Sequence, residues 1–148
     1  MTTILAPVDF SQVSERVVGA AVTLARAFSG RVVLLNVIQP PIITSEYGMV
    51  MENVQELLAV SEKSAAKQLE RLREKFASGS DFSIELVQQT GSPVPMILDH
   101  ARAIAADYIV LGSHGHTALY NLLVGSTASG IVKGAVCPVV LIPPARNS

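Results

Sequence analysis

The sequence predicts an α/β domain in which a parallel sheet is covered by helices on both faces. Two observations lead to this fold class. Five strand-like segments alternate with four helix-like segments, and such alternation makes a parallel sheet with right-handed crossovers. The second strand-like segment is almost continuously apolar, which is typical of a strand covered on both faces. The 148 residues contain no repeat or linker, so we expect a single domain, 1–148.

The predicted strands are short apolar runs bounded by turn residues. In the third, apolar and polar residues alternate, which is typical of a strand near the edge of a sheet. The last is expected to lie at a sheet edge as well. In chain order the five segments are Thr3–Val8, Val32–Ile38, Phe82–Leu86, Tyr108–Leu111 and Val139–Ile142.

The predicted helices carry apolar residues at helical spacing. Ser11 is expected to cap the first helix and Gly30 to close it, while a turn, a cap and a proline at 91–93 open the third. Charges of both signs on the second helix indicate a solvated face. Residues 42–50 show no period and are expected to form a loop. In chain order the four helices are Val13–Phe28, Glu52–Ala77, Pro93–Ala106 and Ser126–Ala135.

The composition excludes several classes of protein. With 49% hydrophobic residues, 16% charged residues and a net charge of -1, the chain is neither disordered nor a nucleic-acid binder, which would need a basic face. Mean hydropathy is +0.43, yet no stretch approaches the roughly 18 apolar residues of a membrane-spanning helix. No signal peptide is evident, and one cysteine, Cys137, excludes an internal disulfide framework. We expect a cytoplasmic protein that does not engage a membrane.

The most informative segment follows the fourth predicted strand. It consists of Gly112-Ser113-His114-Gly115, then nine residues, then Gly125-Ser126-Thr127 at the start of a helix. Glycines let the backbone approach a ligand closely, and the unpaired N–H groups of a helix start favour an anion. On spacing alone, a phosphate cradle and a purely structural turn with a helix cap fit equally well.

Familiar phosphate-binding motifs do not match the chain. There is no G-x-x-x-x-G-K-[ST], and no G-x-G-x-x-G follows the first strand, where the turn is Asp9-Phe10-Ser11. Rossmann-type dinucleotide and Walker-type binding are therefore disfavoured, and flavin binding is a weaker possibility still. Taken alone, Asp9 is more often a cap or turn residue than a ligand contact. Further ligands for a metal beside His114 and His116 are not evident.

Along essentially its whole length, the chain resembles a universal stress protein domain. Ile4–Ser11 is similar to the family's first strand with its aspartate, Asp107–Gly115 to its fourth strand and loop, and Cys137–Ile142 to its last strand. The spacing G-x2-G-x9-G-[ST] separates the family's ATP-binding branch from members that have lost the site. The resemblance implies a Rossmann-like, adenine nucleotide alpha hydrolase-like sheet in the order 3-2-1-4-5. It also implies a homodimer formed by antiparallel pairing of Val139–Ile142.

The resemblance further implies a binding site, carried over residue by residue. Asp9 and Val37 would contact the adenine, and Pro7 would lie beside the nucleoside. Leu111 and Gly112 would line the adenosine. The residues that would hold the phosphates are His114, Gly115, Gly125, Ser126 and Thr127.

One departure concerns the helix after the glycine-rich loop, which contains Gly130 and Gly134. Two interior glycines weaken a helix by roughly 1 kcal/mol each relative to alanine. We expect this helix either to pack tightly against the sheet or to fray when the phosphates leave.

These observations predict an ATP-binding regulator or sensor of the stress response with little or no catalysis, and no catalytic residue is assigned. A metal such as Mg²⁺ or Mn²⁺ would be held mainly by phosphate oxygens. Two alternatives stay open: a slow ATPase or phosphotransferase, and a nucleotide-free dimeric interaction module whose glycine loop is structural.

Overall fold

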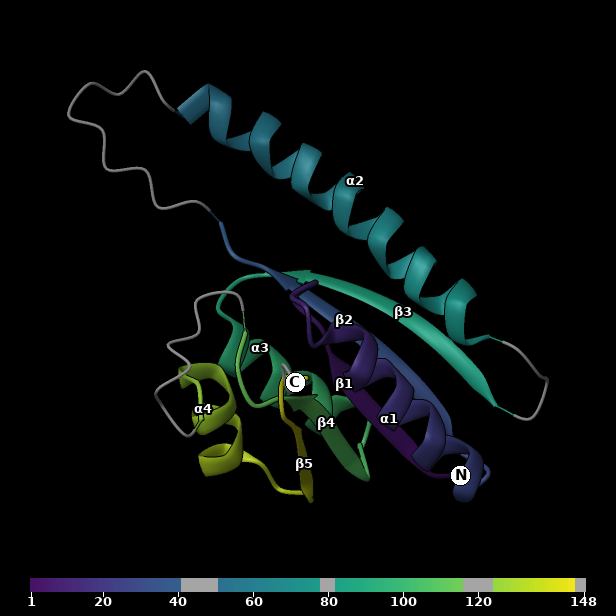
Figure 1. The fold of residues 1–148 in the computed structure, drawn as a ribbon. Coiled ribbons are helices and arrows are strands. Elements are labelled where there is room, and N and C mark those ends of the chain that lie inside the picture. The colour runs from purple at the N-terminus through teal and green to yellow at the C-terminus, as the bar shows by residue number, and fades with distance from the viewer. Residues whose placement is uncertain (41–50, 78–81, 116–123, 146–148) are drawn as a thin grey trace.

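The computed structural model describes residues 1–40, 51–77, 82–115 and 124–145, so the loop predicted at 42–50 lies outside the described residues. Five strands, all paired in parallel, form one sheet in the order β3-β2-β1-β4-β5 (Figure 1). The predicted fold class and strand order are therefore confirmed. The elements are β1 Thr3–Pro7, α1 Ser14–Ala27, β2 Arg31–Ile38, α2 Met51–Phe76, β3 Ser83–Thr90, α3 Pro93–Ala103, β4 Tyr108–Gly112, α4 Ser126–Gly134 and β5 Val139–Ile142.

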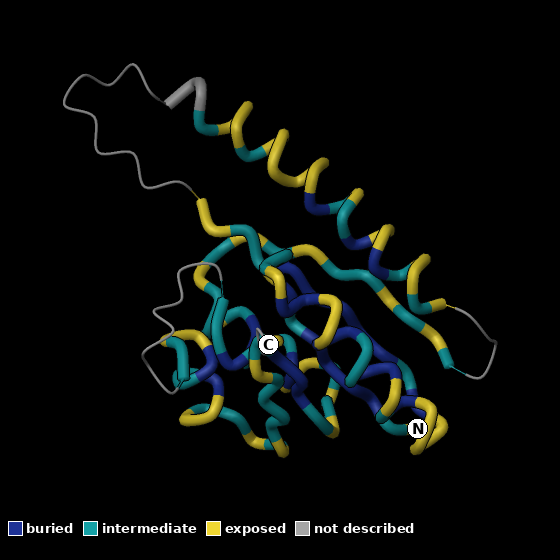
Figure 2. Tube along the Cα trace, in the orientation of Figure 1, coloured by how far each residue is buried: buried dark blue, intermediate teal, exposed yellow. Residues whose placement is uncertain are grey.

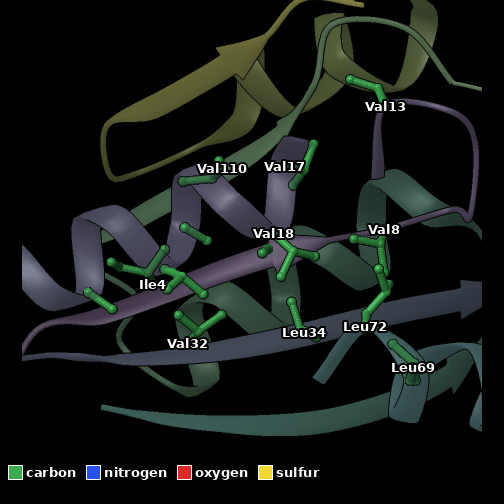
Figure 3. Packing of buried hydrophobic residues seen from close by; sticks show 14 residues of the cluster. Ile4, Val8, Val13, Val17, Val18, Val32, Leu34, Leu69, Leu72 and Val110 are labelled. Atoms are coloured by element: carbon green, nitrogen blue, oxygen red, sulfur yellow. The ribbon is translucent and has the colours of Figure 1, made fainter. Parts of the chain in front are cut away.

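Helices cover both faces of the sheet, α1 and α2 on one side and α3 and α4 on the other (Figure 1). Successive residues of a strand point to opposite faces, so each face has its own core. Ile4 and Ala6 of β1 pack with α1 and α2, in the cluster drawn in Figure 3, whereas Leu5 packs with α3 and α4. All three are fully buried, as expected for a central parallel strand.

Helix α2 is buried along part of its length only. Ala65, Leu69 and Leu72 face the sheet, whereas Leu57 and Val60 in its N-terminal half are 53% and 66% exposed. Figure 2 shows that the buried residues of α2 lie in its C-terminal half, among exposed ones. No helix in the described part of the chain is long and apolar enough to cross a bilayer.

The start of α1 differs from the expectation, because Ser11 does not cap it. The helix begins at Ser14 with Val13 at the N-cap and no capping side chain. The backbone of Ser11 is instead part of a turn: its N–H donates to Asp9 Oδ1 (3.0 Å) and its carbonyl accepts from the Ser14 N–H (3.0 Å). Phe10 reverses the chain there with φ at 63°. Ser92, predicted to cap α3, occupies the N-cap position without a side-chain bond, and Pro93 opens that helix as expected.

Two helix ends are closed by residues other than glycine. At the end of α1, Ser29 takes the left-handed conformation with φ at 52°, and the following Gly30 donates its N–H to the Ala25 carbonyl at 2.7 Å. Gly30 is needed for space, since a β-carbon there would overlap the carbonyl oxygen of Thr2. Helix α3 ends at Ala103, three residues before the predicted Ala106, because Ala105 turns the chain with φ at 51°.

The interior glycines of α4 face the neighbouring helix. A β-carbon on Gly130 would lie 2.9 Å from Val94 Cγ2, and one on Gly134 would lie 2.6 Å from Leu98 Cδ1. Val94 and Leu98 belong to α3, so the glycines allow the two helices to approach closely. The expectation of tight packing thus holds: Ala128 and Ile131 of α4 pack in one cluster with residues of the sheet, and the two glycines face α3.

Candidate functional site

A cavity of about 580 Å³ opens at the carboxyl end of the sheet. It lies where the strand order reverses, with β1 flanked by β2 on one side and β4 on the other. Ligands of open α/β sheets bind at this kind of switch point. The structure brings together all ten residues that were predicted to form the site. They are Pro7, Asp9, Val37, Leu111, Gly112, His114, Gly115, Gly125, Ser126 and Thr127.

Asp9 is positioned by the turn between β1 and α1. Its Oδ1 accepts the N–H of Ser11 at 3.0 Å, so the carboxylate stabilises the turn as well as lining the cavity. Its Oδ2 lies against Gly115, where a β-carbon would overlap it. Both the turn role and the cavity role considered for Asp9 are therefore seen together.

The glycine-rich loop is joined to the start of α4. The N–H of Gly125 donates to the carbonyl of Ser113 at 2.7 Å, and Gly125 is the N-cap residue of the helix. Ser126 and Thr127, in the first helical turn, line the cavity. The N–H groups of a first turn lack partners within the helix, so α4 presents hydrogen-bond donors and the positive end of its dipole at this wall.

Three buried polar residues line the wall and were not among the predicted site residues: Ser14 at the start of α1, and Asn36 and Ser113 in or directly after strands. Asn36 is 6% exposed, and its Nδ2 donates to the Val8 carbonyl at 2.8 Å, which fixes the end of β1 to β2. Ser113 is 8% exposed, and its N–H donates to the Ile142 carbonyl at 2.9 Å. For Asn36 and Ser113, the available signal was a polar residue directly after, or inside, an apolar strand.

The electrostatics of the cavity are simple. Among the described residues that line it, Asp9 and His114 are ionisable, and none is a lysine or arginine. The Nδ1 atom of His114 lies 2.9 Å from the Ser113 hydroxyl oxygen. The described residues contain no group of three or more His, Cys, Asp or Glu side chains that could hold a metal ion. A metal at this site would therefore take its other ligands from a bound molecule or water.

Two other residues with reactive side chains, His100 and Cys137, are not among the residues that line the cavity. His100 on α3 is held by Gln89, whose Nε2 lies 3.1 Å from its Nδ1, in agreement with a helix-packing role. Cys137 is half-buried, and burial, followed by the charge of Asp107, raises the pKa of its thiol. A thiol with a raised pKa is a poor nucleophile, so the structure favours a packing role for Cys137.

Comparison with known proteins places this geometry in a family. The family model described as "Universal stress protein family" matches residues 1–143. A universal stress protein of Methanocaldococcus jannaschii is 30% identical over 94% of this chain and 80% of its own length. Universal stress protein YxiE of Bacillus subtilis is 28% identical over 93% of this chain and 96% of its own. The solved structure of UspA from Lactobacillus plantarum superposes with a TM-score of 0.86 at 27% identity, over 95% of this chain and 97% of that one. The sequence match and the shared overall fold agree, and the chain belongs to the universal stress protein family.

Proposed function

We propose that this protein binds ATP in the cavity at the carboxyl end of the sheet and acts as a nucleotide-dependent regulator or sensor. The observation that carries the proposal is the convergence of ten residues from separate segments on one cavity of about 580 Å³. That volume lies within the usual range for small-molecule sites.

The phosphates are assigned to the wall formed by the glycine-rich loop and α4. Gly115 and Gly125 have no room for a side chain without displacing Asp9 or the Ser113 carbonyl, so the backbone itself lines the cavity there. Close backbone approach and the free N–H groups of a helix start suit phosphate oxygens. The hydroxyls of Ser126 and Thr127 add donors at the same wall.

The adenosine is assigned to the part of the cavity beside β1, β2 and β4. Pro7, Val37 and Leu111 supply apolar contacts, and the Asp9 carboxylate supplies an acceptor. A mostly apolar pocket with few polar groups is the usual setting for a flat heteroaromatic base.

Neighbours in fold support a nucleotide as the class of ligand. One similar structure is described as a universal stress protein in complex with cAMP, with a TM-score of 0.68 at 18% identity. Another, from Archaeoglobus fulgidus, is described as a complex with dAMP, with a TM-score of 0.62 at 22% identity. These two ligands belong to those two proteins. At such low sequence identity, the likeness shows that the present chain shares their fold.

A metal ion such as Mg²⁺ or Mn²⁺ would be coordinated mainly by the phosphates and water. The described cavity wall offers a single carboxylate, that of Asp9. The metal would neutralise phosphate charge at a wall whose described residues include no lysine or arginine. Slow ATP hydrolysis and a nucleotide-free module are the rival functions.

The direct test is to purify the protein, denature it and identify any small molecule that is released. ATP or another adenine nucleotide is expected; its absence, together with no binding of added ATP by calorimetry, would favour the nucleotide-free module. Gly125→Val is the matching variant, since its side chain would meet backbone atoms, the Ser113 carbonyl at 3.1 Å and His114 Cα at 3.5 Å. We expect a folded variant without ATP binding, and unchanged affinity would refute the phosphate assignment.

A homodimer formed through β5 and a cytoplasmic location belong to the same proposal. The strand lies at one edge of the sheet, next to β4 alone. An apolar edge strand readily pairs with a second copy. We propose that nucleotide occupancy changes the surface that this dimer presents to a protein partner.

A further inference from the structure

The charge of the phosphates has few protein groups to balance it. Among the described residues lining the cavity, His114 alone can become a cation. On the basis of the proposed nucleotide binding, we infer that Ser113 is a positioning residue that orients the His114 ring toward the phosphates, and that the ring contacts them as an imidazolium. Nucleotide binding would then be accompanied by uptake of a proton.

The Ser113–His114 pair suits both charge states of the ring. The hydroxyl oxygen of Ser113 lies 2.9 Å from Nδ1 of His114. A hydroxyl both donates and accepts, so it donates to Nδ1 of a neutral ring protonated at Nε2 and accepts from Nδ1–H of the imidazolium. In both states the other ring nitrogen, Nε2, carries a hydrogen. The ring can therefore gain its charge without losing the bond that orients it.

Ser113 itself is anchored on two sides. Its N–H donates to Ile142 of β5 at 2.9 Å, and its carbonyl accepts the Gly125 N–H at 2.7 Å. Because the residue is also buried, its hydroxyl is held in place relative to the start of α4. That start is the wall assigned to the phosphates, so the loop presents the ring and the helix donors to one ligand.

Only one charged group shares these walls with His114 in the described part of the chain. A second cavity of about 390 Å³ adjoins the first, with His114 and Gly115 lining both. The turn before α1 contributes the Asp9 carboxylate, and the other described residues that line the two cavities are uncharged. They include Ser11, Gln12 and Val13 before α1, Pro144 and Ala145 after β5, and Gly125, Ser126 and Thr127 at α4.

A phosphate that binds beside the ring favours its charged form, the imidazolium. Histidine ordinarily changes charge between pH 5 and 8, and carboxylates titrate near pH 4, so the proton taken up in this range is assigned to the ring. Affinity should therefore be higher at low pH, where the ring is already charged, and should fall as the pH rises.

The test is calorimetric titration of the full-length protein with ATP and excess Mg²⁺ from pH 5.5 to 8.0. At each pH, two buffers with different protonation enthalpies give the number of protons taken up. We expect proton uptake near pH 6.5 and roughly tenfold weaker binding at pH 8.0 than at pH 5.5. The terminal phosphate of ATP titrates in the same range, and comparison with His114→Gln cancels that contribution.

Matched variants distinguish proton uptake by the His114 ring from contributions of neighbouring residues. His114→Gln should lose most of the uptake, whereas His116→Gln, two residues further along the chain, should keep it. Ser113→Ala should reduce the uptake, and Ser113→Thr, which retains a hydroxyl, should restore it; a residue that served packing alone would not alter proton uptake. Equal uptake by wild type and His114→Gln overturns the inference.

A second measurement covers the case in which His114→Gln fails to bind or fold. The imidazole resonances of the wild type, assigned with single variants, are followed by NMR across the same pH range with and without ATP. The midpoint of the His114 titration should rise on adding ATP, and that of His100 should not. An unchanged His114 midpoint in protein that binds ATP overturns the inference. Absence of ATP binding at every pH would instead refute the proposed function.

Discussion

The α-carbon of Gly115 lies directly against the carboxylate of Asp9, with no space between them for a β-carbon. The two residues come from opposite sides of the switch point, the turn after β1 and the loop after β4. This contact explains why glycine is needed at 115, since a side chain there would push the carboxylate from the position that the Ser11 N–H stabilises.

We therefore predict that Gly115→Val abolishes ATP binding in a protein that remains folded. The valine side chain would displace Asp9 and fill space assigned to the phosphates. Calorimetry would measure the affinity, with thermal unfolding as the check on the fold. Gly19→Ala is the matched control, because its β-carbon would meet only Phe76, at an ordinary 3.5 Å. If Gly115→Val binds like wild type, Asp9 and Gly115 do not form part of the site.

The close contact between α3 and α4 makes a prediction about stability. Alanine is the better helix former, yet Gly130→Ala should destabilise the protein, because its β-carbon would lie 2.9 Å from the stiff side chain of Val94. We expect a loss of about 1–2 kcal/mol in the free energy of unfolding, measured with urea.

The double-mutant cycle with Val94→Ala tests the cause. Removing the branched side chain gives the new methyl group room, so the two changes together should cost less than the sum of the single changes. Additive effects would show that the contact between Gly130 and Val94 does not limit the approach of the helices.

The fold was open to prediction because it depends on patterns that repeat along the chain. β1 and β2 have no polar face, and α1 and α3 show clear apolar stripes, so their types and order were readable. The exceptions depend on contacts distant in sequence. Gly30 was expected to end α1, as glycine commonly does by adopting the left-handed conformation. Ser29 adopts that conformation instead, and Gly30 is needed because a side chain there would overlap Thr2.

Site residues could be predicted where the backbone conformation or a close approach requires glycine. They could not be predicted where a residue is placed in the site by hydrogen bonds to distant segments. The spacing drew attention to Gly115 and Gly125 but fitted a structural turn equally well, and the family resemblance assigned them to the site. Asn36 and Ser113 were missed as site residues because contacts between segments distant in sequence bury them and hold them in place. Asn36 bonds to the Val8 carbonyl, 28 residues away, and the N–H of Ser113 bonds to the Ile142 carbonyl of β5.

The edge strand β5 leads to a prediction about assembly. The carbonyls of Pro138 and Ile142 accept N–H groups of the β4 segment, at 3.0 and 2.9 Å. Residues alternate in their bonding direction along a parallel strand, so Val140 also faces β4, whereas Val139 and Leu141 present their N–H and carbonyl groups outward. Pairing with a second copy would use the outward groups.

We expect Leu141→Pro to convert a dimer into monomer, since proline removes an outward N–H. Leu141→Ala is the matched control, because it loses the same side chain but keeps the N–H, and it should remain dimeric. Val140→Pro should instead break the ladder with β4 and cause aggregation. Light scattering at micromolar concentration reports the outcome, and a monomeric wild type would count against pairing through β5.

The final prediction is that ATP is bound but hydrolysed slowly or not at all. Fast phosphoryl transfer requires positively charged groups that stabilise the negative charge of the transferred phosphoryl group. It also requires a residue that orients the nucleophile. From Gly112 to Val132 the sequence contains no Lys, Arg, Asp or Glu. Lys133 lies in the last turn of α4, at the opposite end from the phosphate wall, and Asp107 directly precedes β4, at the far end of the sheet.

The groups that do line the cavity bind ground and transition states alike. Backbone N–H groups, hydroxyls and the one imidazolium inferred for His114 hold a triphosphate, but none of them is placed to orient an attacking nucleophile, and uniform binding does not raise turnover. Phosphate release with Mg²⁺ should therefore stay well below about 1 s⁻¹, the lower end of the ordinary enzyme range. Gly125→Val is the control for contaminating ATPases, because activity that persists in a variant unable to bind ATP belongs to another protein. Turnover above that rate that disappears in Gly125→Val would establish a catalytic group in this cavity and make the protein an ATPase.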